Sequence, residues 1–433
     1  MIASDRRLIG TLRQNRLDGG VGVYSVCSAH PVVIQAALEL ARKRNQVAVI
    51  EATCNQVNQD GGYTGITPDV FADQVKRAAT AAGLSEHDLI LGGDHLGPQP
   101  WRNLPAVQAL AKATAMVEGY AKAGFRKLHL DCSMSCADDD GEPGDAVVAQ
   151  RAAQLAVAAE AVAPKSTPPL YVIGTEVPPP GGMGEGHGIV PTDPARVLET
   201  WRAHRDAFDQ VGLGDAFSRV VAIVVQPGVD FGNEDVVQFA PSAAAGLAEA
   251  VRDVEGAVYE AHSTDYQKPE SYAGLVDMHF AILKVGPAAT FALREAIYAL
   301  EGVAREMVDW NPNEGVRAAL EAAMCANPAH WTSHYSGDER QRAYLRHFSY
   351  SDRSRYYWTD PAVSQQVDRL FERLDAQPLP LPLISQYLPQ HAQAVGDGRV
   401  PATALGLCIA NIQLALTPYA DACGAQRSTV SES

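Results

Sequence analysis

Eight short apolar runs, each followed by a segment with helical character, constrain the fold of this chain more than any other feature. The runs cover residues 22–27, 47–53, 89–98, 127–133, 171–177, 220–228, 257–263 and 280–287. Most lack the polar–apolar alternation of a half-exposed strand, so we predict parallel strands that are buried on both faces. Eight such strands with intervening helices indicate an α/β fold of the (β/α)8 or TIM-barrel type. A doubly wound open sheet is the alternative.

Polar side chains at the ends of the runs favour the barrel. Nearly every run carries a carboxylate, imidazole, amide or amine near its carboxyl end. An open sheet needs such residues only near its switch point, whereas a barrel collects all strand ends at one mouth. We therefore predict a (β/α)8 barrel over residues 1–300. Beyond it, Ala-, Glu- and Arg-rich helical segments predict a C-terminal helical region, residues 301–433, packed on the barrel.

The composition excludes several classes of function. The net charge of −16 argues against a nucleic-acid surface, which needs a basic patch. No apolar run approaches the length of a membrane helix. The seven cysteines are odd in number and scattered, which indicates reduced thiols and predicts a cytoplasmic protein. A homo-oligomer is the default expectation for such a protein.

The third run holds the strongest candidate for chemistry. Gly92 and Gly93 interrupt it, and Asp94 and His95 follow directly. Neighbouring residues of a regular strand face opposite sides, but a break at the strand end lets both side chains reach one site. An acid beside an imidazole offers one base and one metal ligand. The alternative is a turn whose Asp-His pair makes only a structural hydrogen bond.

Residues at the ends of other strands complete a candidate metal site. Glu260 and His262 share one face of their strand, as His129, Asp131 and Ser133 do, because strand side chains alternate. His129 taken by itself is interpreted as structural or exposed rather than catalytic. Two histidines with a carboxylate are a common catalytic set for divalent ions. The predicted ligands of a Zn, Mn, Ni or Mg ion are His95 and His262, with Glu176, Glu260 or Asp131 completing the coordination. The predicted catalytic residues are Asp94, Asp131 and Glu260.

Two further patterns predict substrate contacts. The amide-rich loop after the second strand suits a polyol, whose hydroxyls need neutral donors and acceptors. Loops after strands seven and eight are frequent phosphate sites in barrels, and Arg353 and Arg355 would either join them or dock the helical region on the barrel. The predicted substrate-binding residues are Glu51, Asn55, Gln56, Gln59, Ser133, Gln226, Ser263, Asp265, Tyr266, Lys284, Arg353 and Arg355.

Long motifs resemble one known family. The segments are Ser25–Pro31, Glu51–Gln59, Gly92–Pro98, Tyr259–Gln267 and Ser351–Trp358. They resemble the tagatose-1,6-bisphosphate aldolase accessory (non-catalytic) subunit family, which includes tagatose-6-phosphate 4-epimerases. The resemblance implies a class II aldolase-like barrel, a phosphorylated ketohexose substrate and, for some members, a class II aldolase partner chain.

The resemblance also implies roles for single residues. Asp94 and His95 resemble the catalytic acid/base and the adjacent metal ligand of class II aldolases, and His262 resembles a later ligand. A third histidine is expected near the end of the sixth strand, where this chain has Gln226. Glu176 or Glu260 would then have to replace it.

Three functions follow as hypotheses. The first is a metal-dependent isomerase, a 4-epimerase that interconverts D-tagatose 6-phosphate and D-fructose 6-phosphate by retro-aldol cleavage between C3 and C4. Proton abstraction and return by two carboxylates is the alternative mechanism. The second function is a non-catalytic subunit that stabilises a D-tagatose-1,6-bisphosphate class II aldolase. The third, a complete ketose-bisphosphate aldolase, would need a second phosphate site.

Overall fold

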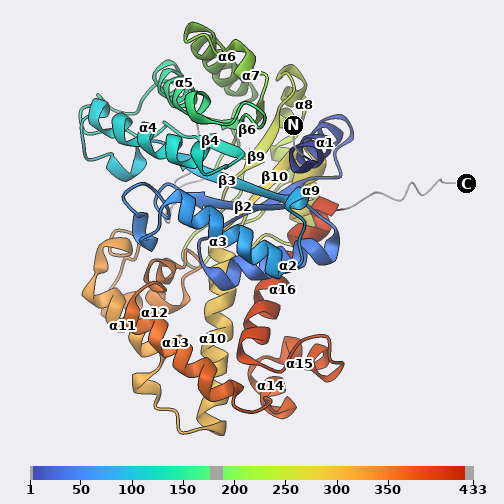
Figure 1. Cartoon of the computed structure of the whole chain (residues 1–433), viewed down its shortest axis with the longest axis vertical. Coiled ribbons are helices and arrows are strands. Elements are labelled where there is room, and N and C mark those ends of the chain that lie inside the picture. Colours follow the sequence, from blue (N-terminus) through green and yellow to red (C-terminus); the bar gives the residue numbers. More distant parts are fainter. Residues whose placement is uncertain (1–2, 176–188, 425–433) are drawn as a thin grey trace, which may run out of the picture.

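The computed structural model, which describes residues 3–175 and 189–424, contains a closed barrel of eight parallel strands (Figure 1). Around the barrel the strand order is β1, β2, β3, β4, β5, β6, β9 and β10. Their bounds are β1 Val23–Cys27, β2 Ala48–Thr53, β3 Leu89–Leu96, β4 Lys127–Leu130, β5 Leu170–Ile173, β6 Val220–Val224, β9 Val258–Ala261 and β10 Phe280–Val285. All eight predicted strands are present, so the predicted (β/α)8 fold is confirmed.

Helices alternate with these strands, and half of the helices begin with proline in the first turn, where its missing N–H costs no hydrogen bond. The helices are α1 Ala3–Asp18, α2 Pro31–Arg44, α3 Pro68–Ala81, α4 Ala106–Lys122, α5 Asp145–Val162, α6 Pro194–Gln210, α7 Gly214–Phe217, α8 Ala245–Ala250, α9 Pro269–Asp277, α10 Pro287–Met307, α11 Val316–Ala326, α12 Glu339–Phe348, α13 Pro361–Asp375, α14 Leu381–Tyr387, α15 Pro389–Gly396 and α16 Ala404–Gly424. No helix in the two described ranges is long and apolar enough to cross a membrane.

One strand pair was not predicted from the sequence. β7 Asp230–Phe231 and β8 Val236–Val237 form a small antiparallel hairpin between β6 and β9. Strands of two residues are too short to show any periodicity, which explains why the pattern of the sequence does not reveal them.

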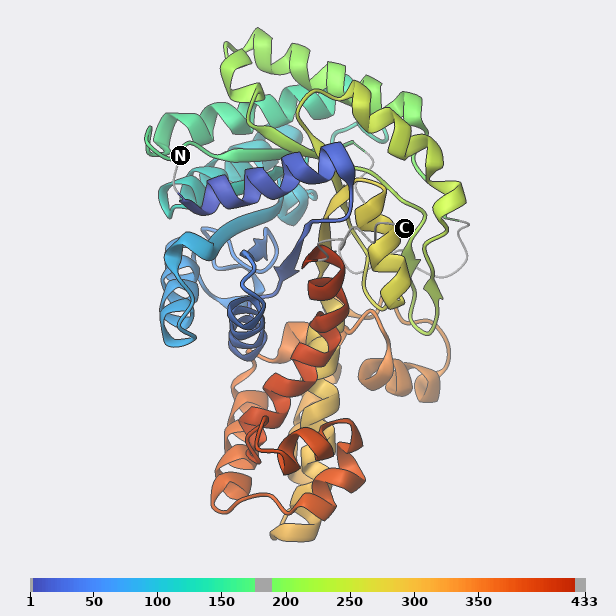
Figure 2. The same cartoon turned by 90° about the vertical axis from the view of Figure 1, so that its right-hand side faces the viewer.

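Helix α10 connects the barrel with the C-terminal helical region. It starts at the barrel mouth directly after β10, runs away from the barrel, and α16 returns beside it (Figure 2). The last residues of α16 then pack against α2, α9 and β1. The predicted division at residue 300 falls inside α10, and the partition into two domains stays a prediction.

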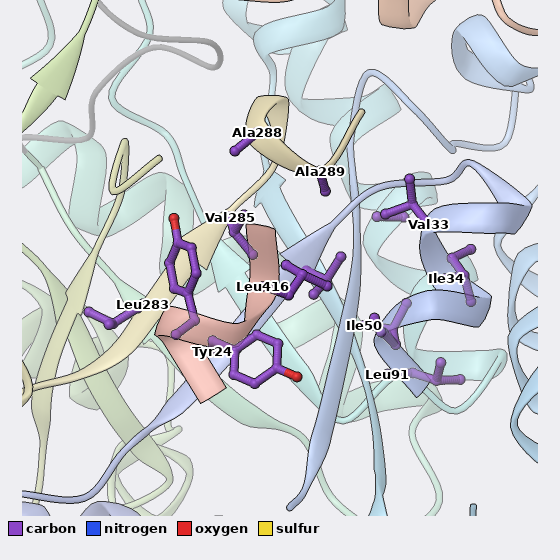
Figure 3. Close-up of a cluster of buried hydrophobic side chains, with 14 of the residues drawn as sticks. Tyr24, Val33, Ile34, Ile50, Leu91, Leu283, Val285, Ala288, Ala289 and Leu416 are labelled. Atoms are coloured by element: carbon purple, nitrogen blue, oxygen red, sulfur yellow. The ribbon is translucent and has the colours of Figure 1, made fainter. Parts of the chain in front are cut away.

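The returning helix fills part of the barrel wall with apolar side chains. Leu416 of α16 lies among side chains of β1, β10, α2 and α10, including Tyr24, Leu283 and Val33 (Figure 3). Tyr419 also donates a hydrogen bond to the backbone carbonyl of Thr264, at 2.8 Å. Because Leu416 and Tyr419 are fully buried, α16 is an integral part of the barrel wall.

A buried ion pair fixes one segment of the C-terminal region to α10. Asp352 precedes the 3-10 helix η8 (Arg353–Tyr357) and adopts a left-handed backbone conformation with φ 41°. Its carboxylate accepts from Arg294 Nε at 3.1 Å and from Thr290 Oγ1 at 2.5 Å, both on α10. Arg294 is 1% exposed, so this pair is shielded from water and holds η8 beside the barrel mouth.

We expect Asp352→Ala to lower the free energy of unfolding by about 3 kcal/mol, because it leaves the Arg294 charge buried without its partner. Urea unfolding followed by circular dichroism measures this change. The control is Asp397→Ala, which removes a half-exposed pair with Arg399 and is expected to cost about 1 kcal/mol or less. Equal effects of the two substitutions would contradict the structural role of Asp352.

Candidate active site

An irregularity at the end of β3 brings Asp94 and His95 to one site. The register between β3 and β4 shifts between Gly93 and Leu96, and His95 has a positive φ of 49°. A bulge of this kind re-aims neighbouring side chains, and both residues line the same pocket at the barrel mouth. A Cβ at Gly97 would stand 1.6 Å from the carbonyl oxygen of Asp131, so this close approach requires glycine.

Beneath the mouth, the barrel encloses a network of charged side chains. Lys127 Nζ lies 2.6 Å from Glu51 Oε1 and 2.7 Å from Glu260 Oε2, and all three side chains are completely buried. Lys284 Nζ contacts Glu51 Oε2, lies 2.9 Å from Asp94 Oδ1 and 3.6 Å from Glu260 Oε1. Each buried charge therefore has at least one partner of opposite sign, as burial of charge requires.

This network keeps Asp94 ionised. Burial favours the neutral acid, but His95 and Lys284 outweigh it and hold the pKa of Asp94 well below its usual range. Asp94 Oδ1 accepts from His95 N at 3.0 Å and also faces Lys284 and His129. Asp94 Oδ2 makes no hydrogen bond within the described part of the chain, and it is 3.7 Å from His95 Nε2. A carboxylate oxygen is thus left for a ligand in the pocket.

Three imidazoles converge beside Asp94. The ring centroids of His95, His129 and His262 are 5.0–5.3 Å apart. Each ring has one nitrogen on a carboxylate: His95 Nδ1 on Asp131 Oδ2 at 2.9 Å, His129 Nδ1 on Asp94 Oδ1 at 3.0 Å, and His262 Nε2 on Glu260 Oε1 at 3.0 Å. The second nitrogen of each ring makes no hydrogen bond with a described residue. Carboxylate-bound imidazoles with a free nitrogen are typical of metal-binding histidines.

The residues present fit a divalent cation. His129 Nε2 is buried without a hydrogen-bond partner in the described chain, which is costly unless a ligand occupies it. Asp94, His129, Glu260 and His262 also offer donor atoms that all lie within 4.8 Å of one another. Burial lowers the pKa of His262 to about 4, so this ring is neutral near pH 7, as a metal ligand must be. The donor set of imidazoles and carboxylates suits zinc, nickel or manganese better than magnesium.

A pocket with a volume of about 520 Å³ opens above these groups, between the barrel mouth, η8 and α13. Its lining includes half of the residues singled out from the sequence: Asn55, Gln56, Asp94, His95, His262, Ser263, Asp265, Lys284 and Arg355. Aromatic side chains, among them Tyr63, Tyr356 and Trp358, form part of the wall. A volume of this size and a mixed polar and aromatic lining are typical of small-molecule sites.

Other singled-out residues do not line the pocket, and three of them hold residues that do. Glu51 and Glu260 anchor the lysines, and Asp131, which accepts from Ser133 Oγ at 2.6 Å, holds His95. Gln226 Oε1 accepts from two backbone N–H groups of its own turn, at 2.8 and 3.0 Å. Gln59, Tyr266 and Arg353 bond to Lys112 O, Tyr350 O and His334 Nδ1 respectively. Glu176 lies outside the described residues.

Two central residues were missed from the sequence. His129 was interpreted as structural or exposed, and Lys127 was not considered, yet both are completely buried in the centre of the site. A signal exists in the alternation of Lys127, His129 and Asp131 along one strand, since residues two apart share a face. Three ionisable residues on one face of a buried strand require partners inside the barrel, and that requirement points to them as a group.

Comparison with known proteins agrees with this architecture. The crystal structure of a probable tagatose 6 phosphate kinase from Sinorhizobium meliloti 1021 is 46% identical, with a TM-score of 0.86, and the match covers 93% of this chain and 100% of that one. A fructose-bisphosphate aldolase from Campylobacter jejuni is 16% identical, with a TM-score of 0.46 and coverage of 87% and 95%. The fructuronate-tagaturonate epimerase UxaE from Cohnella laeviribosi is 14% identical, with a TM-score of 0.47 and coverage of 93% and 82%.

A family model matches residues 8–424, nearly the whole chain, and describes the D-tagatose-1,6-bisphosphate aldolase subunit GatZ/KbaZ-like proteins. The match agrees with the resemblance of the five sequence motifs and extends over both the barrel and the C-terminal helices. The chain therefore belongs to the GatZ/KbaZ-like family of D-tagatose-1,6-bisphosphate aldolase subunits.

Proposed function

We propose that the chain is a metal-dependent 4-epimerase that interconverts D-tagatose 6-phosphate and D-fructose 6-phosphate. The observation that carries this proposal is an ionised Asp94 next to three carboxylate-bound imidazoles, all at one pocket of about 520 Å³. Family membership supports a tagatose-phosphate substrate. A scaffold protein has no need of unpartnered polar atoms in its interior, because each one lowers stability.

His129, His262 and Glu260 would hold the metal ion, since they belong to one group of donor atoms within 4.8 Å of one another, while Asp94 orients His129 and Asp131 orients the neighbouring His95. When bound, a divalent ion supplies Lewis-acid polarisation of the C2 carbonyl. Asp131 is a positioning residue in this proposal, since it acts through His95. Glu176, which was predicted as a ligand, is not needed for a complete set.

Asp94 is the proposed proton-transfer residue. Its Oδ2 accepts the proton of the C4 hydroxyl, and the O–H electron pair becomes the new carbonyl bond at C4. The C3–C4 bond breaks, and its electron pair enters the enediolate of the three-carbon fragment. After rotation of the aldehyde, the bond re-forms on its other face and Asp94 returns the proton. Asn55 and Gln56 face the same pocket and supply amide groups for the sugar hydroxyls.

The second candidate is a stabilising subunit of a class II aldolase, and the description of the family favours it. The two functions differ in one measurable respect, which is turnover by the purified chain alone. The full chain with fructose 6-phosphate and a divalent ion is expected to form tagatose 6-phosphate, and EDTA is expected to abolish the reaction. Turnover that requires an added aldolase chain would overturn the epimerase proposal.

Asp94→Asn is expected to reduce the rate of epimerisation by about 10²–10⁴-fold, because the amide has the same shape but cannot accept the C4 hydroxyl proton. The measurement is kcat for fructose 6-phosphate, with product quantified by chromatography. Asp60→Asn changes an exposed acid that pairs with Lys112 away from the pocket, and it is expected to leave kcat unchanged. An unchanged kcat in Asp94→Asn would exclude Asp94 as the base.

His129→Gln is expected to weaken metal binding by about 10–100-fold, because it removes a nitrogen that has no hydrogen-bond partner among the described residues. Competition with a chromophoric chelator measures the affinity independently of activity. His204→Gln is the matched control, since His204 is also fully buried with an unpartnered Nε2, but on α6. Equal metal affinity of both variants would contradict the proposed site.

The retro-aldol route makes a separate prediction about the hydrogen on C4. This hydrogen stays on carbon throughout cleavage and re-formation, so turnover in heavy water should leave C4 without deuterium. Nuclear magnetic resonance of the product measures the exchange. Deuterium at C4 would instead support removal and return of the C4 hydrogen by two carboxylates.

A further inference from the structure

The N-terminus of α10 holds a carboxylate at the place where barrels commonly bind phosphate. Asp265 Oδ1 accepts from Gly286 N at 3.0 Å and from Ala288 N at 2.8 Å. In (β/α)8 barrels the loops after the last two strands, together with a helix N-terminus, are a frequent phosphate site. Here the backbone N–H groups that a phosphate would use are already bonded to Asp265, which is 3% exposed.

A phosphate at this position would meet two obstacles. It would have to displace the carboxylate from two N–H groups, and it would stand against the like charge of a buried acid. Asp265 lines the pocket with Lys284, but Lys284 is already paired with Asp94, Glu51 and Glu260. Among the described residues that line the pocket, the loops after β9 and β10 therefore offer a sugar phosphate no unpaired positive charge.

The arginines of η8, in contrast to Lys284, make no ion pair with a described carboxylate. Arg355 lines the pocket, and Arg353 is 5% exposed, with a buried Nε that has no hydrogen-bond partner. Among the described residues, neither arginine is within 4.0 Å of a carboxylate oxygen. Arg355 bonds to the carbonyl oxygens of Ser351 and Asp352 and to Tyr356 Oη. Two guanidinium groups that make no direct ion pair with a described carboxylate leave a positive charge that an anion would neutralise.

We propose that the pocket contains a single phosphate subsite, formed by Arg355 with Arg353 behind it, and that Asp265 closes the α10 N-terminus to a second phosphate. The protein would therefore take ketohexose monophosphates and discriminate against ketohexose bisphosphates. The identity of the sugar rests on the proposed function, whereas the count of phosphate groups rests on Asp265 and the two arginines. Asp265 is thus a specificity-determining residue.

Calorimetric titration of the wild-type full chain tests the proposal without any variant. Fructose 6-phosphate is expected to bind at least about tenfold more tightly than fructose 1,6-bisphosphate, as a charge repulsion in a buried site implies. Inorganic phosphate is expected to compete with fructose 6-phosphate. Equal affinity for the monophosphate and the bisphosphate would overturn the role of Asp265.

Variants separate the two parts of the proposal. Asp265→Ser keeps a helix-capping hydroxyl but removes the charge. It should reduce the ratio of the affinities for fructose 6-phosphate and fructose 1,6-bisphosphate at least about tenfold. Asp338→Ser, which changes the N-cap of α12 outside the pocket, should leave the preference unchanged. A preference that stays at the wild-type value in Asp265→Ser would contradict the exclusion of a second phosphate.

Arg355→Gln should weaken the binding of fructose 6-phosphate and of inorganic phosphate at least about tenfold. Arg399→Gln, on an exposed loop, should leave both affinities unchanged. Arg355→Lys keeps the positive charge, so it should retain part of the affinity for phosphate. It serves as the second test if Arg355→Gln folds poorly. If the folded Arg355→Gln variant bound phosphate as tightly as the wild type, the proposed subsite on η8 would be wrong.

Binding and turnover test the two proposals separately, so the phosphate subsite and the epimerase activity can be disproved independently. Tight, selective binding of fructose 6-phosphate without formation of tagatose 6-phosphate would preserve the phosphate subsite and overturn the proposed epimerase. Turnover by a chain that binds the bisphosphate equally well would preserve the epimerase and overturn the single subsite.

Discussion

The pairing of Lys127 and Lys284 with Glu51, Asp94 and Glu260 is the interaction on which the site depends. Buried charges inside a barrel are tolerated only when each has a partner of opposite sign. Removal of one member of a pair leaves the other buried without compensation for its desolvation. With Asp131 included, four carboxylates face two ammonium groups, which leaves two negative charges beside the imidazoles. A divalent cation would balance them. The same charges that orient the histidines therefore also favour the ion that the histidines would bind.

The alternation of strands and helices was sufficient to predict the barrel, because parallel strands buried on both faces have a distinctive apolar pattern. The break at Gly92 and Gly93 was visible in the sequence, and in the structure Asp94 and His95 line one pocket. The sequence could not place His129, because its role depends on two carboxylates and two imidazoles from other strands. Lys127 was missed for a related reason: a lysine within an apolar strand has no interpretation until its partners are known. Judging alternate residues as a group, rather than one by one, would have found both.

For Arg353 and Arg355 the sequence left two roles open, phosphate binding and docking of the helical region, but the buried docking contact belongs to their neighbour Asp352. Asp352 docks the segment on α10 through Arg294, while the neighbouring Arg355 faces the pocket. Docking and ligand binding are therefore linked within a few residues, since the ion pair fixes the backbone that carries the arginine. This explains how a helical region outside the barrel contributes to the site, and why that region is matched by the family model together with the barrel.

The return of α16 to the barrel has a consequence for the order of folding. Its side chains cover β1, which lies almost 400 residues earlier in the sequence. Contacts of such large sequence separation are slow to form and leave apolar surface exposed in the meantime. On the ribosome, the wall formed by β1, β10 and α2 would stay uncovered until α16 has emerged. A shortened chain without α16 would thus expose the apolar surface of β1, β10 and α2. Such a species is prone to aggregate or to bind chaperones.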